Sequence, residues 1–431
     1  ELTLAIAAVS LVAFAVVSRR LSRSALTGTI LFTALGLVLG PNGFDLVDSS
    51  LYLGGSDIVT LVLTATLVVV LFTDASAINS SKWRDDIVPA RLLGIGLPLA
   101  IVFGWLLAVV LLGTLEIWEA ALLATMLAPT DAALGKAVVS NERVPERIRQ
   151  ALNIESGLND GIALPVFVIF LETASVAEKS LTVSDLVAEL AKQVGIAVVI
   201  GVAVGWIGAW AIRWGRTSGQ AIGYWLEIGL VALAGSAFVI AAPLGGSGFI
   251  AAWVAGFVFG RAFVSAPEDT LPEFAEATGD LLTLASFFVF GVSLGPLLTN
   301  LDWRIVLYAF LSLGAVRMLA VAISLIGAGM RIPSVVYIGW FGPRGLATLI
   351  LTIEVVGSSE LQGASTIADT ALVTVALSVV LHGVTAWWGS NTYANYLETH
   401  PNVADLGEQL APVVNVRVPL RSRQYPFERR D

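Results

Sequence analysis

Two short polar strings lie inside long apolar stretches of the chain: Ala-Pro-Thr-Asp at 128–131 and Glu-Ser-Gly-Leu-Asn-Asp at 155–160. A carboxylate at the centre of a membrane helix costs about 2.5–3.5 kcal/mol on insertion scales. Such a residue is retained there when it is paired or when it serves ion transfer. Asp131 and Asp160 fall in consecutive apolar stretches, so the pattern predicts a pathway for a cation or a proton.

The residues around Asp160 are suited to holding a cation. Ser156, Asn159 and Asp160 stand at i, i+3 and i+4, which places them on one face of a helix. Hydroxyl, amide and carboxylate oxygens are ligands for a hard cation. We expect Thr130 to add a backbone oxygen or a hydrogen bond to Asn159. Asp74 closes the third apolar stretch, within the string LVVVLFTDAS, and we expect it to guard the cytoplasmic approach.

Glu155 lies one residue off that face and needs a partner of its own. Arg317 and Arg344 both stand within apolar stretches and could supply it. We favour Arg317, because a charge in an otherwise unbroken apolar helix has no other evident purpose, and we predict a structural Glu155–Arg317 ion pair. We expect His382 to be a packed polar residue rather than a pH sensor.

The composition places the chain in a membrane. Of its 431 residues, 56% are hydrophobic and 13% charged, whereas a soluble domain carries about 25% charged residues. The net charge of −9 argues against nucleic acid as a partner. Cysteine is absent and only His382 and His400 are present, too few histidines for a His-based zinc site. We expect no cofactor.

A span needs about 20 mostly apolar residues, so we expect an all-α polytopic membrane protein of about 13 transmembrane helices. We interpret the first apolar run as a span rather than a signal peptide. The candidate spans are 2–17, 25–40, 57–73, 88–112, 117–139, 146–171, 192–214, 220–241, 246–264, 279–298, 303–327, 333–356 and 366–389.

The charges of the connecting segments alternate. The basic connections are 18–24, 82–91, 136–149 and 213–216, and the acidic or uncharged ones are 45–57, 116–119, 172–189 and 243–248. The positive-inside rule predicts an N-terminus outside and a C-terminus in the cytoplasm. Residues 390–431 contain four prolines and end in a basic cluster, so we expect a short cytoplasmic tail after a transmembrane domain over 1–389.

Two spans should be interrupted. Pro129 removes a helix donor and Gly135 loosens the turn beyond it, so the fifth span, 117–139, should break around Thr130–Asp131. The string Gly-Pro-Arg-Gly at 342–345 should break the twelfth span, 333–356. Interrupted helices at matching places in two halves indicate a transporter site at the bilayer midplane.

We therefore predict an inverted repeat of residues 1–171 and 220–389, linked by the span 192–214. Broken helices leave dipole ends within the membrane. We expect Asp131 to offset the positive ends and Arg344 the negative ends.

At these residues the chain resembles the NhaP-type sodium/proton antiporters, relatives of the animal sodium/proton exchangers. The resemblance covers about 2–389. It rests on APTDAALG and ERIRQALNIESGLNDGIALP, with support from LFTDAS, GSGFIAAWVAG and FGPRGLA. It implies a homodimer in which a six-helix core moves against a dimerisation domain. Where many relatives have proline after the Thr-Asp pair, this chain has Ala132.

The resemblance also implies roles for the site residues. Asp160 would carry the cation and the proton, with Ser156 and Thr130 completing a site for transported Na⁺. Thr130 and Asp131 would form the unwound crossing. Glu155 with Arg317 would be the structural ion pair.

These expectations describe electroneutral exchange of a monovalent cation for H⁺ by alternating access. Na⁺ is favoured by the resemblance, and K⁺ and Li⁺ stay open. Electrogenic relatives have two adjacent aspartates where this chain has Asn159 and Asp160, so one carboxylate would load a cation or a proton in turn. We expect a prokaryotic inner membrane with its lipid around the protein.

Two other classes of membrane protein would require different sequence features. A channel would need a selectivity-filter string or a ring-forming repeat, and the chain has neither. An intramembrane hydrolase would need a serine framed by glycines near His382, or paired catalytic aspartates. We therefore predict a secondary transporter and not an enzyme.

Overall fold

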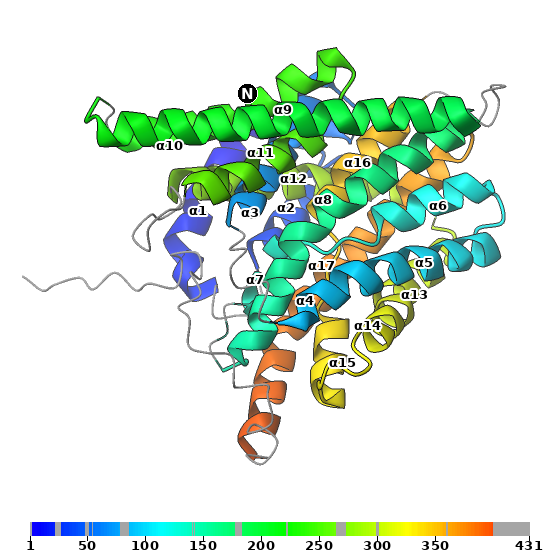
Figure 1. The fold of residues 1–431 in the computed structure, drawn as a ribbon. Coiled ribbons are helices and arrows are strands. Elements are labelled where there is room, and N and C mark those ends of the chain that lie inside the picture. Colours follow the sequence, from blue (N-terminus) through cyan, green and yellow to red (C-terminus); the bar gives the residue numbers. More distant parts are fainter. Residues whose placement is uncertain are drawn as a thin grey trace, which may run out of the picture.

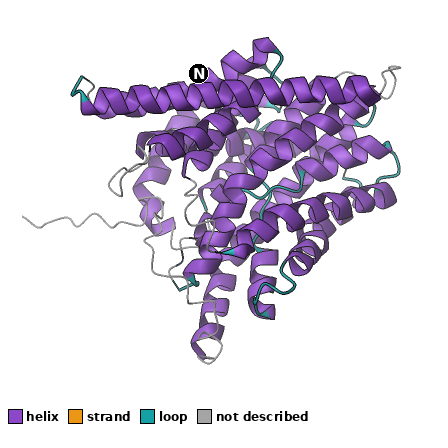
Figure 2. Ribbon diagram, viewed as in Figure 1, coloured by secondary structure: helices purple, strands orange, loops and turns teal. Residues whose placement is uncertain are grey.

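The structure is a computed structural model in which every regular element of the described part of the chain is a helix (Figures 1 and 2). The described residues are 2–21, 27–47, 51–53, 55–77, 86–139, 141, 143–176, 183–220, 223–263, 273–298, 301–358 and 361–399. The end of the predicted tail, 400–431, and parts of the basic connections 18–24 and 82–91 lie outside them.

The helices follow the predicted spans in order. The first half contains α1 (Leu2–Leu21), α2 (Gly28–Leu39), α3 (Asp57–Ala77), α4 (Ile87–Arg91), the π-helical turn η3 (Leu92–Gly96), α5 (Leu97–Leu111), α6 (Ile117–Met126), α7 (Ala132–Val139) and α8 (Glu146–Val176). The second half contains α9 (Val183–Thr217), α10 (Gly223–Ala241), the 3-10 turn η4 (Ala242–Leu244), α11 (Gly248–Phe263), α12 (Glu273–Leu297), α13 (Trp303–Leu311), the π-helical turn η5 (Ser312–Val316), α14 (Arg317–Ser324), α15 (Ile332–Trp340), α16 (Leu346–Gly357) and α17 (Ala364–Thr399).

Eight helical segments among the described residues are long and apolar enough to cross a membrane. Several others are apolar but shorter, including α2, α6, α11 and α16. The polytopic helical architecture is therefore confirmed, while the count of 13 spans stays a prediction. The last helix, α17, continues to Thr399, beyond the predicted end of its span at residue 389.

The helices form two groups. In one group α9 packs on α10 and α11, α11 packs on α3, and α12 packs on α2 and α3. In the other α5 packs on α6, α8 on α6 and α7, and α17 on α13 and α16. The long helix α9 runs along one side of the molecule (Figure 1).

Both predicted interruptions are present. Residues 127–131 separate α6 from α7, and residues 341–345 separate α15 from α16. Each unwound segment is five residues long with proline at its third position, Pro129 or Pro343. Because proline has no backbone N–H to donate, it favours the break at these places.

Glycines in α11 let this helix approach α3 closely. A Cβ atom added at Gly256 would lie 2.3 Å from the carbonyl oxygen of Phe72, and one at Gly260 would lie 2.2 Å from that of Ser76. Both contacts are with backbone, which cannot rotate away as a side chain can. The two helices would therefore have to separate to accept any larger residue.

This packing predicts that Gly260→Ala lowers the thermal unfolding midpoint of the purified protein. Overpacking of this kind costs about 1–3 kcal/mol. The matched control is Gly229→Ala in α10, where an added Cβ meets nothing within 4 Å. The control should leave the midpoint unchanged or raise it, since alanine favours a helix more than glycine does. Equal midpoints for the two variants would contradict the role of the contact.

Candidate ion-binding site at the helix crossing

The two unwound segments meet directly. The backbone N–H of Asp131 donates to the carbonyl oxygen of Pro343 at 2.8 Å. The breaks of the fifth and twelfth predicted spans, far apart in sequence, therefore form one crossing. Unwound backbone in a membrane is tolerated only where protein satisfies its polar groups, and this hydrogen bond satisfies one donor and one acceptor.

The carboxylate of Asp131 binds the start of two helices. Its Oδ1 accepts the N–H of Leu134 in α7 at 2.9 Å, and its Oδ2 accepts the N–H of Leu346 in α16 at 2.6 Å. The N-termini of helices carry partial positive charge, so one negative side chain neutralises both ends. A Cβ atom at Gly345 would lie 2.1 Å from Oδ2 of Asp131, so glycine at this position leaves room for the carboxylate.

Arg344 faces the opposite kind of helix end. Its side chain is buried, and its Nη1 atom donates to the carbonyl oxygens of Ala128 and Pro129, which follow the end of α6. These carbonyls lie at the negative end of the α6 dipole. Asp131 and Arg344 thus supply charge of the sign that each helix end requires, in the arrangement that the sequence predicts.

A polar network next to the crossing joins α8 to the first break. The hydroxyls of Thr130 and Ser156 are 3.0 Å apart, and Nδ2 of Asn159 donates to Oγ1 of Thr130 at 2.7 Å. All three side chains are buried. The Oδ1 atom of Asn159 has no hydrogen-bond partner among the described residues. The network therefore offers an uncommitted oxygen beside two hydroxyls.

Asp160 follows this network on α8 and is half-buried. The charges of Asp131 in the first break, Asp74 in α3 and Arg344 in the second break all act on it. Within the described residues, however, no three His, Cys, Asp or Glu side chains are close enough to hold a metal ion together.

Glu155 and Arg317 form a bidentate ion pair. Nη1 of Arg317 donates to Oε1 of Glu155, and Nη2 donates to Oε2 at 2.7 Å. Both side chains are only 2% exposed. Arg317 begins α14 immediately after the π-helical turn η5. A Cβ at Gly342 would lie 2.5 Å from Nε of Arg317, so the pair lies against the second break.

His382 is also buried and hydrogen-bonded. Its Nε2 atom is 3.0 Å from the carbonyl oxygen of Trp340, and its Nδ1 atom is 3.2 Å from the hydroxyl of Ser378. Ser378 in turn accepts the backbone N–H of Arg344 at 2.6 Å. The sequence analysis did not single out Ser378. The only signal for it is its position four residues before a histidine in an apolar helix.

A second residue that the sequence analysis missed is Trp253 in α11. Its indole Nε1 points at the carbonyl oxygen of Gly157 at 3.5 Å. A Cβ at Gly161 would lie 2.1 Å from the indole ring. The ring therefore covers the backbone of α8 on both sides of Asp160 in sequence, at a contact between the two groups of helices.

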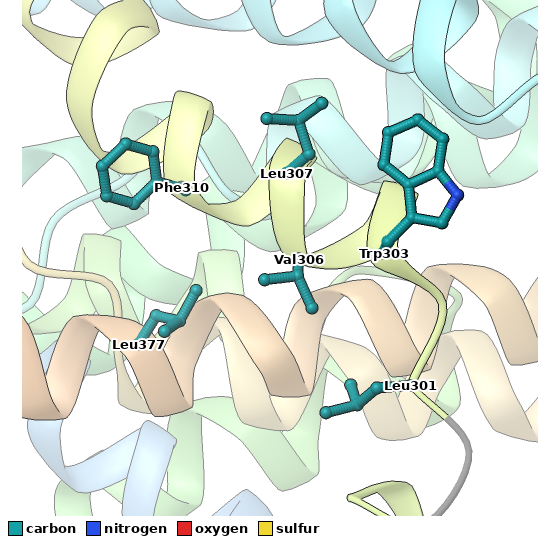
Figure 3. A pocket seen from close by; sticks show the side chains of 6 residues that line it. All are labelled: Leu301, Trp303, Val306, Leu307, Phe310 and Leu377. Carbon is teal, nitrogen blue, oxygen red and sulfur yellow. The ribbon is translucent and has the colours of Figure 1, made fainter.

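Of two hollows in the structure, one reaches a residue of this site and the other does not. A small cavity reaches Ser156 and is lined by Gly135, Val138, Val139, Leu152, Asn153, Ser156, Phe341 and Pro343. A larger groove of about 600 Å³ lies between α13 and α17, and Figure 3 shows its lining of Leu301, Trp303, Val306, Leu307, Phe310 and Leu377. These six side chains contain no oxygen, so the groove lacks the ligands that a hard cation needs.

Two broken helices that cross within a helical membrane protein, with charged residues at the crossing, define the architecture of a secondary transporter. The family model described as "Sodium/hydrogen exchanger, transmembrane" matches residues 6–388. The chain therefore belongs to this family, which is one of transporters and not of enzymes.

Two curated relatives are similar to parts of the chain. A Na⁺/H⁺ antiporter of Schizosaccharomyces pombe is 28% identical over 156 residues, which are 34% of this chain and 33% of the relative. The K⁺/H⁺ antiporter NhaP of Alkalimonas amylolytica is 24% identical over 344 residues, which are 75% of this chain and 55% of the relative. The chain thus spans about a third and about half of the lengths of these relatives.

Solved structures share the fold. A structure of the sodium proton antiporter MjNhaP1 from Methanocaldococcus jannaschii at pH 8 superposes with a TM-score of 0.71 at 20% identity, covering 91% of this chain and 98% of that one. An electron-microscopy structure of the same antiporter gives a TM-score of 0.69 at 22% identity, covering 92% and 98%. The NhaP-type resemblance that the sequence motifs indicate is confirmed.

The buried pair predicts a non-additive pattern of destabilisation. Glu155→Gln or Arg317→Met alone should lower the thermal midpoint and the folded yield strongly, because removing one partner of a buried ion pair costs about 3–5 kcal/mol. The double variant should lose less than the sum of the two single losses, since it leaves no uncompensated charge. The thermal midpoints of the native protein, the two single variants and the double variant are measured in detergent. Additive losses would show that the two side chains act independently.

Proposed function

We propose that this protein is a secondary active transporter that exchanges a monovalent cation for H⁺ across the membrane. The observation that carries the proposal is the position of Asp160, half-buried beside the Thr130–Ser156–Asn159 network at the crossing of two broken helices. Membership of the sodium/hydrogen exchanger family supports it.

The cation site consists of Asp160, Ser156 and Thr130, with Oδ1 of Asn159 as a fourth oxygen. Asp131 stays bound to the two helix N-termini and acts on Asp160 through its charge. Asp74 in α3 lies on the approach to the site. No cofactor takes part, and the cation is a substrate.

Na⁺ is the proposed substrate cation, in keeping with the family description. K⁺ is the second candidate, because the relative that matches 75% of this chain is named a K⁺/H⁺ antiporter. The two ions use the same ligand chemistry and differ in the cavity size they need. The test below therefore compares Na⁺, K⁺ and Li⁺.

Coupling follows from competition for one carboxylate. Burial in an apolar surrounding disfavours the charged carboxylate. Asp160 therefore crosses the hydrophobic barrier readily only when a cation or a proton is bound to it. A cation or a proton neutralises it equally, and the empty charged site stays in place. Because Asn159 is an amide and does not titrate, one proton moves against one monovalent cation and the exchange is electroneutral.

The proposal includes the architecture that alternating access requires. Residues 1–389 form the transporter domain, with repeats over 1–171 and 220–389 joined by the span 192–214. The matching five-residue breaks with a central proline support this repeat. The six-helix core contains the broken spans and moves against the other group of helices, which holds two copies together as a homodimer.

The orientation rests on the charges of the connections. The N-terminus lies outside, the C-terminus and the tail 390–431 lie in the cytoplasm, and the membrane is a prokaryotic inner membrane. The protein supports pH homeostasis and sodium transport there.

The exchange is tested in proteoliposomes with an acidic interior and an internal pH dye. Addition of Na⁺, K⁺ or Li⁺ outside should alkalinise the interior, and Asp160→Ala should abolish the response because no group is left to load. The matched control is Asp57→Asn, which removes an exposed aspartate at the start of α3 and should keep full activity. No response to any of the three cations, or equal rates for Asp160→Ala, would refute the proposal.

Electroneutrality predicts that an imposed membrane potential leaves the exchange rate of the native protein unchanged. Asn159→Asp adds a second carboxylate next to Asp160, so its exchange should become sensitive to voltage. The potential is set with a K⁺ gradient and valinomycin while Na⁺-driven proton flux is followed, and the same K⁺ gradient without valinomycin controls for exchange of K⁺ itself. A voltage-dependent rate in the native protein would show that each transport cycle moves net charge across the membrane.

A further inference from the structure

One face of α17 fastens the second broken helix. Ser378 accepts the N–H of Arg344, and Nε2 of His382 faces the carbonyl oxygen of Trp340. The indole of Trp340 donates to Thr385 at 3.0 Å.

Two turns further along α17, the hydroxyl of Ser390 is hydrogen-bonded to the hydroxyl of Tyr337, and that of Tyr393 to the hydroxyl of Ser334, each at 2.8 Å. α15 and the break are thus joined to α17 along several turns.

His382 is the member of this set that spans the break. Trp340 is the last residue of α15, and Arg344 is the fourth residue of the unwound segment. The imidazole contacts Trp340 directly and reaches Arg344 through the hydroxyl of Ser378. It therefore links the residue just before the segment 341–345 to the fourth residue within that segment.

The contacts define the form of the imidazole. The carbonyl of Trp340 can only accept, so Nε2 of His382 must carry a hydrogen. In a neutral ring Nδ1 is then an acceptor for the hydroxyl of Ser378, whose oxygen takes the N–H of Arg344. A doubly protonated ring could instead donate from Nδ1 to the Ser378 carbonyl, 3.1 Å away. That cationic form would lose the acceptor for the Ser378 hydroxyl, and it would bury a positive charge whose described hydrogen bonds go only to neutral groups, which is costly.

The segment that His382 spans also positions the ion site. Pro343 accepts the N–H of Asp131, and the N–H of Leu346 donates to the Asp131 carboxylate. Arg344 binds the carbonyls of Ala128 and Pro129, just before Thr130. Any displacement of 341–345 therefore moves Thr130 and Asp131, although His382 itself is not a ligand of the proposed site.

The contacts of α8 with the first break resemble those of α17 with the second. Ser156 and Asp160 are four residues apart on α8, as Ser378 and His382 are on α17. Ser156 contacts Thr130, the fourth residue of the first break, and Ser378 contacts Arg344, the fourth residue of the second. The position that holds the ion-binding carboxylate in one half holds an imidazole in the other.

We infer that His382 is a positioning residue, neutral throughout turnover, that fixes the unwound segment 341–345 and thereby the cation site at Thr130 and Asp160. The inference rests on the proposed function for its transport readout. It assigns His382 a mechanical role in cation binding and excludes it as the pH sensor of the protein.

The experiment compares His382→Gln with His382→Leu in the proteoliposome assay. Glutamine retains one donor and one acceptor and should keep the apparent KM for the cation and the whole pH profile within about twofold of native. Leucine removes both groups, and the apparent KM should rise about tenfold, which corresponds to about 1.4 kcal/mol. Ser378→Ala should raise the KM as well, and adding it to His382→Leu should bring little further change.

A second readout does not depend on transport. Hydrogen–deuterium exchange of a peptide containing 341–345 should be faster in His382→Leu than in the native protein, and native-like in His382→Gln. Failure of the transport proposal would abolish the assay signal for all variants but leave this difference intact. If His382→Leu does not fold, the Ser378→Ala and His382→Gln variants carry the test.

Three results would overturn the inference. One is a displaced pH profile in His382→Gln, since a titrating histidine cannot be replaced by an amide without such a change. Another is a native KM in a folded His382→Leu protein. The third is unchanged hydrogen exchange of 341–345 in both His382→Leu and Ser378→Ala.

Discussion

Unwinding a helix inside a membrane leaves backbone N–H and C=O groups and exposed dipole ends where water cannot reach them. The rest of this structure depends on how that constraint is met. One carboxylate, Asp131, takes the N-termini of α7 and α16, and one guanidinium, Arg344, takes the carbonyls after α6. Because the two breaks also bond to each other between Asp131 and Pro343, neither can shift without the other.

The surrounding helices contact this crossing through specific side-chain hydrogen bonds. α8 contributes Ser156 and Asn159 to the first break, and α17 contributes Ser378 and His382 to the second. The Glu155–Arg317 pair ties α8 to α14 beside them. Asp160 directly follows these attachments on α8, so the helix that carries it is joined both to the first break and to α14.

The parts of the fold that could be predicted from sequence are those where burial is costly. Embedded charges such as Glu155 and Arg317 have few ways to be satisfied, so their pairing followed from elimination. Proline within an apolar run marks a break for the same kind of reason.

Ser378 and Trp253 gave no such signal, because an uncharged residue in an apolar helix costs little wherever it points. The π-helical turns η3 and η5 were also unpredictable, since an i→i+5 turn has no characteristic composition. The number of spans is hard to fix because several apolar helices, among them α6 with ten residues, are too short to qualify alone. Which uncharged side chains contact the crossing could therefore be seen only in the structure.

The glycines of the second break have a consequence for how inherited variation in this chain would be interpreted. Gly342 lies against the guanidinium of Arg317 and Gly345 against the carboxylate of Asp131, each closer than a methyl group allows. A substitution at either glycine changes no charge, yet it must displace a charged partner from its place. A genetic screen for loss of function would therefore group these two glycines with the acidic and basic residues, because any added side chain at either position displaces a charged group.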